Sequence, residues 1–489
     1  MISTQHLSDI IQSNFGHIPT GDQRRAIQVF TDFLMAKRGM TAMILRGSAG
    51  TGKTSIVAAM VQALLALKQR VVLLAPTGRA AKVLALNSHH PATTIHRKIY
   101  RQKSYGDDFS LDINLHTDTV FFVDEASMIS TVPQVPSEGM PMFKGTGGGL
   151  IDDLVTYVYS GRNCRMVLIG DSAQLPPVGE QEAPALQSGV VGCYGLDVLE
   201  CDLSEVVRQE EASGILWNAT RIRHLITHDS ATELPRIRFK GFADIVSLSG
   251  SDLIDTLADS YYKVGQDETV VITRSNKRAN IYNNGIRARV LDQEDELSSG
   301  DRIMIVKNHY FEKEASDKGK DENENDEMGG MSFIANGDMA IVRRIRNERE
   351  LYGFRFADLT LRFPDYDDVE LDMTALLDCL QSESPALTAA QQRKLYDGVM
   401  EDYADIPRKA DRLKALKKDT YYTALQIKFA YAVTCHKAQG GQWQHVYIDQ
   451  GYMTDDMLTP DYIHWLYTAF TRATERLYLV NWTREQTLE

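Results

Sequence analysis

Short apolar runs alternate with helical patterns in the first part of the chain, between residues 40 and 171. Four of these runs are apolar at nearly every position, which is typical of strands buried on both faces: 41–45, 71–74, 120–123 and 166–169. Strands that alternate with helices predict a parallel sheet covered by helices. A polar cluster follows each run, and ligands of open α/β sheets bind beyond the carboxyl ends of the strands. The pattern therefore predicts one site at this edge of the sheet.

A second α/β unit begins near residue 200 and is interrupted by a different pattern. Its expected strands are 269–272 and 430–433. Between them, from about 300 to 365, short strand-like runs separated by Gly-Asp turns predict a small β-barrel, and residues 386–418 have a helical pattern. We therefore expect a first lobe over 1–199, a second lobe over 200–300 and 424–489, and an insert over 301–423.

Two segments of the insert are strongly charged. Residues 312–327 hold eight acidic residues and three lysines with almost no apolar content. A segment of this composition cannot bury enough apolar surface to order itself, so we expect a disordered loop. Residues 408–418 are strongly basic, for which a solvated helix face is the favoured interpretation and a DNA contact the alternative.

The composition of the 489-residue chain is that of a globular protein of several domains. Its net charge of −13 argues only weakly against nucleic acid, because net charge does not say where the charges lie. The five cysteines form no CxxC pair, and we expect buried, reduced thiols. No run approaches the roughly 18 apolar residues of a membrane helix, and the first residues lack a secretory pattern. We expect a soluble, cytoplasmic monomer without membrane contact.

The segment Gly47–Thr54, GSAGTGKT, matches the phosphate-loop pattern G-x-x-x-x-G-K-[ST] and stands between an expected strand and a helical run over 55–67. A chance glycine-rich turn is the alternative, and the flanking elements disfavour it. Glycines let backbone N–H groups face phosphates, while Lys53 would bridge the β- and γ-phosphates and Thr54 would ligate Mg²⁺. ATP and Mg²⁺ are the expected cofactors, and the predicted ATP contacts in this loop are Gly47, Gly50, Thr51, Gly52, Lys53 and Thr54.

Two carboxylates close the third expected strand. Asp124 can hold the Mg²⁺ shell together with Thr54, and Glu125 beside it can orient and deprotonate the attacking water. Paired carboxylates alone are usually part of a solvated loop, but the strand before them and the separate phosphate loop favour hydrolysis. Gln174, in the segment GDSAQLPPV after the fourth strand, would sense the γ-phosphate.

Eight motifs stand in an order that resembles superfamily 1 helicases, and most closely the RecD/Dda-like branch, whose relatives include the Pif family. They are GSAGTGKT, APTGRAAKVL (75–84), TIHRKIY (94–100), VDEAS (123–127), GDSAQLPPV (170–178), LSEVVRQ (203–209), AYAVTCHKAQG (430–440) and YTAFTRATERLYLV (467–480). The resemblance runs from Gln23 to the C-terminus. It implies an α/β fold of two RecA-like lobes with ATP between them, a β-hairpin in the first lobe at about 100–118 and an SH3-like barrel in the second.

The resemblance also implies roles for residues outside the phosphate loop. Gln23 would recognise adenine, and Arg208 and Arg472 would reach the γ-phosphate from the second lobe as arginine fingers. Gln439 and Gly440 would lie near the nucleotide and link cleft closure to the DNA contacts beside them.

The implied DNA contacts are less distinctive as residues. Hydroxyls and cations in the matching motifs would hold phosphates, and His96 would stack on a base, although a lone histidine is more often a core or surface residue. Phe109, in the expected hairpin, would block the second strand of the duplex, with simple packing as the alternative. The predicted DNA-binding residues are Thr77, Arg79, His96, Phe109, Thr434 and His436.

Together these observations predict an ATP-dependent DNA helicase that moves along single-stranded DNA and opens forked duplexes, with 5′ to 3′ polarity implied only by the resemblance. An RNA or RNA:DNA helicase is the nearest alternative, because no residue reports on a 2′-hydroxyl. An alternative of another class is a P-loop regulatory ATPase that acts through a protein partner. Such a protein would not need the second-lobe motifs around His436 and Arg472.

Overall fold

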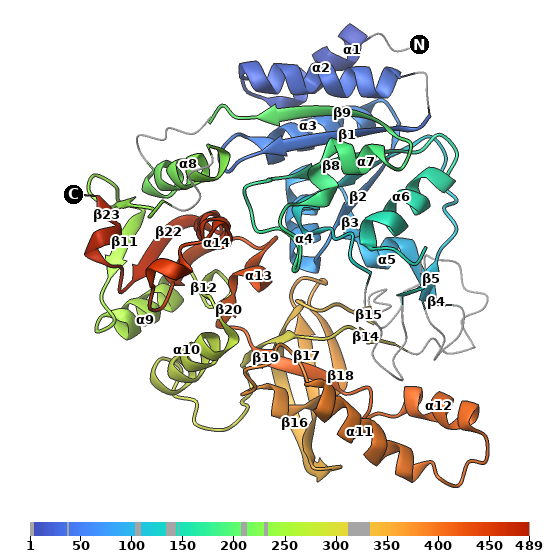
Figure 1. Ribbon diagram of the computed structural model, residues 1–489, viewed down its shortest axis with the longest axis vertical. Helices are drawn as coiled ribbons and strands as arrows, with labels where there is room; N and C mark the ends of the chain where they lie inside the picture. Colours follow the sequence, from blue (N-terminus) through green and yellow to red (C-terminus); the bar gives the residue numbers. More distant parts are fainter. Residues whose placement is uncertain are drawn as a thin grey trace.

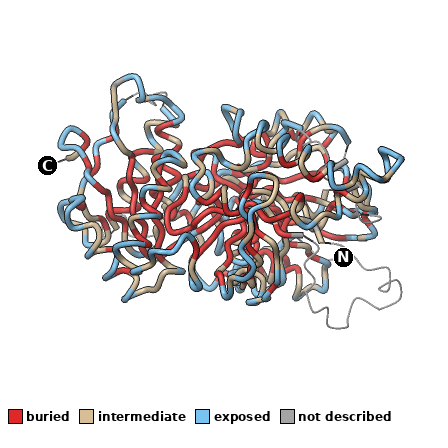
Figure 2. The backbone as a smooth tube through the Cα atoms, turned by 90° about the horizontal axis from the view of Figure 1, so that it is seen from below, coloured by how far each residue is buried: buried red, intermediate tan, exposed pale blue. Residues whose placement is uncertain are grey.

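The computed structural model describes residues 4–36, 39–102, 109–133, 143–144, 146–206, 213–228, 233–311 and 333–488. It consists of two α/β lobes, each with a parallel sheet, and a small β-barrel that adjoins both (Figure 1). Buried residues run through the interior of each part (Figure 2). This arrangement confirms the predicted fold class.

The first lobe has a six-stranded parallel sheet in the order β3-β2-β6-β8-β1-β9. The strands are β1 Thr41–Gly47, β2 Arg70–Ala75, β3 Ala92–Thr94, β6 Thr119–Val123, β8 Arg165–Gly170 and β9 Asp197–Leu203. All four apolar runs of the first lobe form strands, as predicted. Met43 and Leu45 of β1 pack on one face of the sheet, and Ala42 and Ile44 pack on the other, which explains why this strand is apolar without alternation.

Helices cover both faces of this sheet. One face carries α1 Thr4–Phe15, α2 Gly21–Met35 and α3 Lys53–Ala66, and the other carries α5 Ile95–Ile99 and α6 Leu150–Ser160. Helix α4, Gly78–Ser88, follows β2. An antiparallel pair, β4 Tyr100–Gln102 and β5 Phe109–Leu111, lies in the segment where a hairpin was expected, with β7 Phe143–Lys144 beside it. The tip of this hairpin and the side chain of Phe109 lie outside the described residues.

The second lobe has a five-stranded parallel sheet in the order β11-β22-β21-β12-β20. The strands are β11 Ile245–Leu248, β12 Thr269–Thr273, β20 Ala432–Thr434, β21 Trp443–Asp449 and β22 Ala473–Val480. The helices of this lobe that matter for the site are α8 Gly214–Thr227, α10 Asn276–Arg289, α13 Cys435–Ala438 and α14 Pro460–Phe470. Because β12 and β20 are neighbours, chain segments before and after the barrel share one sheet.

Five strands close the barrel: β13 Arg302–Ile305, β16 Met339–Leu351, β17 Phe354–Phe363, β18 Val369–Leu376 and β19 Leu425–Phe429. Helices α11 Ala389–Asp402 and α12 Lys409–Lys418 lie between β18 and β19 in sequence, inside the segment with the predicted helical pattern. A short pair, β14 His309–Tyr310 and β15 Phe333–Ile334, flanks the acidic segment 312–327, which is outside the described residues.

Two strands cross the expected domain boundaries. Strand β9 pairs with β1 and carries the first sheet to Leu203, past residue 199. Strand β19 pairs with β13 and closes the barrel, although the second lobe was expected to resume at residue 424. Neither strand was among the runs expected from the sequence, because local pattern does not give the sheet in which a segment pairs.

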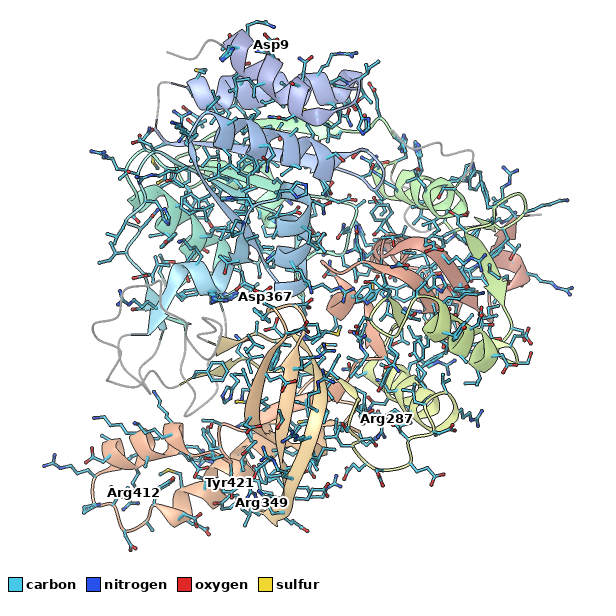
Figure 3. All side chains as sticks on the ribbon, turned by 180° about the vertical axis from the view of Figure 1, so that it is seen from behind. Asp9, Arg287, Arg349, Asp367, Arg412 and Tyr421 are labelled. Carbon is cyan, nitrogen blue, oxygen red and sulfur yellow. The ribbon has the colours of Figure 1, made fainter. Side chains whose placement is uncertain are left out.

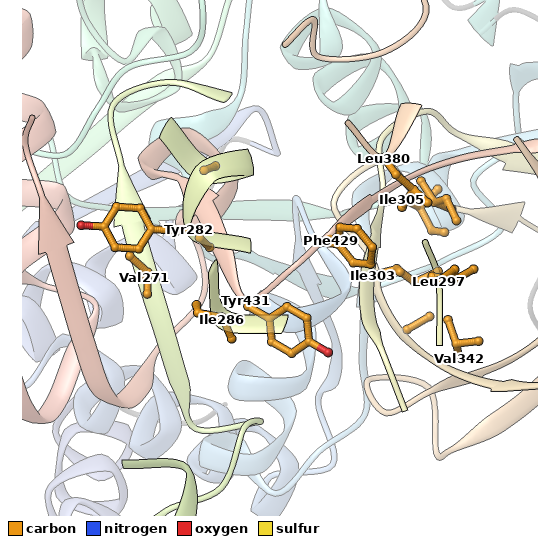
Figure 4. Packing of buried hydrophobic residues seen from close by; sticks show 14 of the residues in the cluster. Val271, Tyr282, Ile286, Leu297, Ile303, Ile305, Val342, Leu380, Phe429 and Tyr431 are labelled. Atoms are coloured by element: carbon orange, nitrogen blue, oxygen red, sulfur yellow. The ribbon is translucent and has the colours of Figure 1, made fainter. Parts of the chain in front are cut away.

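The barrel and the second lobe share one hydrophobic core (Figure 4). Val271 and Ile286 of the lobe belong to the same cluster as Ile303 and Phe429 of the barrel. A buried ion pair of 2.9 Å between Arg287 Nε and Asp301 Oδ1 lies at this junction. We infer that the barrel moves with the second lobe as one body.

Four of the five cysteines are buried free thiols, as expected, whereas Cys193 is an exposed free thiol. The helices within the described ranges include none with the length and apolar character needed to cross a membrane. Those ranges also hold no cluster of three or more histidine, cysteine or acidic side chains suited to a metal ion.

Candidate nucleotide site and nucleic-acid track

The phosphate loop joins β1 to α3 and takes the shape that its glycines allow. Gly50 and Gly52 have φ values of 80° and 74°, in the left-handed region that favours glycine. A Cβ at Gly50 would lie 2.7 Å from Leu216 Cδ1, so Leu216 would have to shift to accommodate a side chain. Lys53 is the first residue of α3 and Thr54 the second. The first amides of α3 therefore face the loop, which is the arrangement that binds phosphate.

Gln23 is buried and links α2 to the phosphate loop. Its Nε2 donates to the carbonyl of Thr51 at 2.9 Å, and its Oε1 accepts from the backbone N–H of Thr20 at 3.0 Å. Thr51 Oγ1 in turn donates to the carbonyl of Ser48 at 2.8 Å. Both ends of the Gln23 amide have protein partners, so adenine recognition by Gln23 stays a prediction.

Asp124 and Glu125 follow β6 at the edge of the sheet where the phosphate loop lies. Burial raises the pKa of Asp124 to about 6, the neighbouring charge of Glu125 adds to this shift, and Lys53 opposes it. The backbone N–H of Glu125 donates to Asp124 Oδ1 at 2.9 Å, and Glu125 has a φ of 50°. A non-glycine residue rarely adopts this conformation, and such outliers cluster at functional sites.

Two buried oxygens near these carboxylates have no hydrogen-bond partner among the described residues: Glu125 Oε2 and Gln174 Oε1. An unpartnered buried acceptor costs free energy, and a ligand or water normally satisfies it. Glu125 and Gln174 are the residues predicted to face the attacking water and the γ-phosphate. Both unpartnered atoms are acceptors, so they suit a water molecule that donates to them, while the first amides of α3 and Lys53 supply the donors that a triphosphate needs. Thr54 and Asp124 are available for Mg²⁺.

Arg472 approaches Glu125 from the second lobe and is almost completely buried. Its Nη1 lies 3.9 Å from Glu125 Oε1 and donates to the carbonyl of Gly441 at 3.1 Å, while its Nε donates to the carbonyl of Thr468 at 3.1 Å. These backbone carbonyls orient the guanidinium toward the carboxylates of the other lobe. Arg208, the second predicted arginine finger, lies outside the described residues.

Tyr467 of α14 joins the two lobes at the phosphate loop. Its hydroxyl donates to Asp171 Oδ2 at 2.6 Å and accepts from the backbone N–H of Ala49 at 3.2 Å. Burial and the adjacent Asp171 raise the pKa of Tyr467 well above its usual value, so the hydroxyl stays protonated. The sequence interpretation did not single out Tyr467, although this residue stands in the same motif as Arg472.

Arg223 of α8 is a second residue that the sequence interpretation missed. Its Nη1 donates to Ser48 Oγ in the phosphate loop at 3.0 Å. No motif marks Arg223, because nothing in the local pattern indicates that α8 packs against a loop 175 positions earlier in the chain.

Gln439 and Gly440 lie between the nucleotide site and the start of α4. Gln439 Nε2 donates to the carbonyl of Leu175 at 2.7 Å, and Gly440 has a φ of 73°. A Cβ at Gly440 would lie 3.1 Å from Thr77 Oγ1 and 3.1 Å from the Cβ of Ala80. These two residues thus contact the segments predicted to sense the γ-phosphate and to bind DNA, and their direct contact with nucleotide stays a prediction.

Thr77 and Arg79 are held at the junction of the lobes. Thr77 caps α4, since its Oγ1 accepts from the backbone N–H of Ala80 at 3.2 Å. Arg79 Nη2 donates to the carbonyl of Gln442 at 2.7 Å, and its guanidinium lies 4.3 Å from the ring centre of Trp443. Both predicted DNA contacts therefore participate in contacts within or between the lobes, and their role in binding DNA stays a prediction.

The predicted histidines occupy different surroundings. His96 on α5 lies with its ring 5.7 Å from that of Tyr100, and burial lowers the pKa of His96 to about 4. A neutral imidazole can stack on a base but cannot form an ion pair with a phosphate. His436 is exposed on α13, two residues after Thr434, and Thr434 pairs with Thr273 of β12.

Two further cations lie near Thr434 and were not predicted. Arg274 follows β12 and is exposed, with its guanidinium 5.3 Å from the ring centre of Tyr462. Lys437 Nζ donates to Asn336 Oδ1 of the barrel, and burial lowers the pKa of Lys437 to about 8. Arg274 could have been predicted from the sequence, because it is a basic residue that closely follows an expected parallel strand.

A barrel loop covers the start of α4. A Cβ at Gly78 would lie 2.7 Å from the hydroxyl of Tyr366, which donates to Asp338 Oδ2 at 2.8 Å. Lys82 Nζ donates to the carbonyl of Pro364 at 2.6 Å. Asp367, in the same loop, lies where the barrel meets the first lobe, whereas Arg412 of the basic helix α12 lies far from this junction (Figure 3).

Two protein families match parts of this chain. The AAA domain family matches residues 20–134, and the UvrD-like helicase C-terminal domain family matches residues 429–480. The first match contains the phosphate loop and both carboxylates, and the second contains Gln439 and Arg472. A curated relative, the uncharacterized protein R530 of Acanthamoeba polyphaga mimivirus, is 22% identical over 505 residues, which cover 88% of this chain and 94% of that protein.

The solved structures similar to this chain include Pif1 helicases. The Bacteroides Pif1 helicase in complex with ADP-AlF3 and ssDNA is 14% identical, with a TM-score of 0.45, over 97% of this chain and 95% of that one. A structure of two coordinating Pif1 helicases at forked dsDNA is 15% identical, with a TM-score of 0.47, over the same shares, 97% and 95%. The Candida albicans Pif1 helicase is 14% identical, with a TM-score of 0.41, over 97% and 96%.

Proposed function

We propose that this chain is a superfamily 1 helicase, an ATP-dependent DNA helicase that moves 5′ to 3′ along a single strand. The match of an AAA domain over residues 20–134 and of a UvrD-like helicase C-terminal domain over residues 429–480 supports the proposal. The observation that carries the proposal is the contact of both lobes at the phosphate site. Arg472 of the second lobe lies 3.9 Å from Glu125 of the first. Hydrolysis and lobe closure are then coupled by the same side chains.

Each residue of the site has a distinct task in the proposed reaction. The phosphate-loop amides and Lys53 hold the triphosphate, and Glu125 accepts the proton of the attacking water. Arg472 stabilises the charge that develops on the γ-phosphate, and it can do so only when the lobes are close. Thr54 and Asp124 would hold Mg²⁺, which supplies positive charge to the phosphates when bound.

Contacts between the nucleotide site and the predicted DNA-binding residue Thr77 support a coupling between ATP hydrolysis and movement along the strand. Gln439 donates a hydrogen bond to the carbonyl of Leu175, the residue after Gln174, while Gly440 packs against Thr77. A change at the γ-phosphate that shifts the lobes therefore displaces the start of α4. Alternate tightening of the two lobes on a strand would move the protein along the phosphate backbone without reading base sequence.

An unwinding assay on partial duplexes with a single-stranded tail at either the 5′ or the 3′ end tests polarity. We expect ATP-dependent unwinding of the 5′-tailed substrate, weak unwinding of the 3′-tailed one, and none with Lys53→Ala. Unwinding restricted to the 3′ tail would contradict the polarity.

ATPase stimulation by single-stranded DNA and by RNA of the same sequence tests the substrate class. We expect the larger stimulation with DNA. A larger stimulation by RNA would assign the protein to RNA, and stimulation by neither would contradict a translocating helicase.

A further inference from the structure

One face of α8 forms part of the wall of the nucleotide site. Helix α8 belongs to the second lobe, where it packs against α14, and it lies where the two lobes meet (Figure 1). Leu216 and Arg223 are seven residues apart, close to two helical turns, so both point from the same face. Leu216 packs on Gly50, and Arg223 Nη1 reaches Ser48 Oγ at 3.0 Å. This face of α8 therefore lies against the first half of the phosphate loop.

The start of α8 is fixed by its own hydrogen bonds. Ser213 caps the helix, since its Oγ accepts from the backbone N–H of Leu216 at 3.2 Å and donates to Asp244 Oδ2 at 2.7 Å. The backbone N–H of Gly214 donates to Asp244 Oδ1 at 2.7 Å. With its start fixed in the second lobe, α8 carries Arg223 toward or away from the phosphate loop as that lobe moves.

Among the described residues, the Arg223 guanidinium donates to Ser48 Oγ of the phosphate loop. It has five N–H donors, and its contact with the loop is to a neutral hydroxyl. Over the described ranges of the chain, no carboxylate forms an ion pair with Arg223. A partly buried guanidinium next to a phosphate loop matches the oxygens of a phosphate group, which accept two parallel hydrogen bonds from its planar fork.

We propose that Arg223 binds the γ-phosphate of ATP from the second lobe and so makes the closed cleft favour the triphosphate over the diphosphate. The inference rests on the proposed function in that ATP is the nucleotide. Arg223 approaches past Ser48 and Arg472 approaches past Glu125, so the two cations reach the phosphate site beside different parts of the first lobe. When ATP is present, charge-assisted bonds to phosphate replace the weaker bond to Ser48. Arg223 then contacts the terminal phosphate directly.

Nucleotide affinities measured without nucleic acid test this role. Fluorescent mant-ADP is displaced by ADP or by the non-hydrolysable analogue AMPPNP, in the presence of Mg²⁺. We expect Arg223→Ala to lower the affinity for AMPPNP roughly 10- to 100-fold, which corresponds to the loss of a charge-assisted hydrogen bond. The affinity for ADP should fall by less than about 3-fold. Arg223→Lys keeps the charge without the planar fork, so its loss of AMPPNP affinity should be smaller. Far-UV circular dichroism checks that each variant is folded.

Arg221→Ala is the matched control. Arg221 lies two residues earlier on α8, is exposed, and has its guanidinium 5.0 Å from the ring centre of Trp217. We expect this variant to keep both affinities. If Arg223→Ala lowered the affinities for AMPPNP and ADP equally, or lowered neither, the inference would be overturned and the proposed function would stand. A wild-type protein that binds neither nucleotide would overturn both.

Discussion

At the scale of single residues, two side chains of the nucleotide site have roles that can be separated by experiment. Lys53 is the first residue of α3 beside the phosphate loop, and its proposed role is to hold bound nucleotide. Glu125 has a buried oxygen without a described partner, and its proposed role is to activate water. Nucleotide binding and ATP hydrolysis should therefore be lost separately, in different variants.

We predict that Lys53→Ala loses nucleotide binding, whereas Glu125→Gln binds ATP and loses hydrolysis by roughly 10²- to 10⁴-fold, the usual contribution of a general base. Fluorescent nucleotide titration and steady-state ATPase measurement distinguish the two effects. Glu125→Gln is nearly isosteric, so a wide loss of structure is not expected. Substantial hydrolysis by Glu125→Gln would reject its role as the base.

Asp338 of the barrel is predicted to make stability depend on pH. Burial raises its pKa from 3.8 to about 7. Between these two pH values the folded chain holds a proton that the unfolded chain releases, so stability falls as pH rises from about 4 to about 7, by at most roughly 1.4 kcal/mol per pH unit. Asp338→Asn keeps an oxygen for the N–H of Ala335 and the hydroxyl of Tyr366, and it cannot ionise.

Thermal denaturation between pH 4 and pH 8 tests this prediction. The Asn variant should unfold at a higher temperature than wild type at pH 8 and at nearly the same temperature at pH 4. Glu348→Gln, at an exposed position of β16, is the control and should keep the wild-type dependence on pH. If the unfolding temperatures of wild type and Asp338→Asn changed with pH in parallel, Asp338 would not be the source of the pH dependence.

At the scale of elements, the barrel connects two parts of the chain with different strengths. A continuous core and a buried ion pair join it to the second lobe, whereas a loop around Tyr366 joins it to the first. The loop contact is small and lies next to Thr77 and Arg79. We therefore expect it to control access to the predicted track.

Gly78→Ala should disturb this contact, because its new methyl group would lie 2.7 Å from the hydroxyl of Tyr366. We predict a several-fold change in affinity for single-stranded DNA, partly reversed by Tyr366→Phe in the same chain, which removes the hydroxyl. Binding of a fluorescent oligonucleotide measures both. Gly189→Ala, on α7 Ser188–Gly192 with open space around it, should leave affinity unchanged. If Tyr366→Phe did not reduce the effect of Gly78→Ala on DNA affinity, contact with the Tyr366 hydroxyl would not be its cause.

At the scale of the whole molecule, a chain with a net charge of −13 is assigned a phosphate-binding track. Positive side chains must then be concentrated along the track, and acidic segments must act at a distance. The segment 312–327 carries 3 − 8 = −5. Beyond about 8 to 10 Å at physiological salt, its repulsion of a phosphate chain is largely screened.

We predict that replacing residues 312–327 with a short Gly/Ser linker leaves single-strand affinity and its salt dependence nearly unchanged. Arg79→Ala should instead weaken binding and flatten the salt slope by about one counterion. Titration of a fluorescent oligonucleotide at several salt concentrations compares the two variants. A marked gain in affinity without the loop would mean that it overlies the DNA path.

The sequence by itself determined the local features of this protein. Continuous apolar runs predicted β1, β2, β6 and β8, and the glycines and lysine of residues 47–54 predicted a phosphate loop at the start of a helix. Such features depend on neighbouring residues along the chain. The order of motifs predicted a helicase, and the match of residues 429–480 to the UvrD-like helicase C-terminal domain agrees with the second-lobe motifs. The roles of Arg208, Phe109 and the acidic segment stay predictions.

Only the tertiary structure decided which distant residues meet. Arg472 approaches Glu125, Gly440 packs on Thr77, and Arg223 reaches Ser48, although each pair is far apart in sequence. The sheet membership of β9 and β19 was decided in the same way. The physical reason is that a periodic pattern records whether a side chain is buried and not what buries it. Partners between lobes follow from how whole surfaces pack, and no local run of residues encodes that.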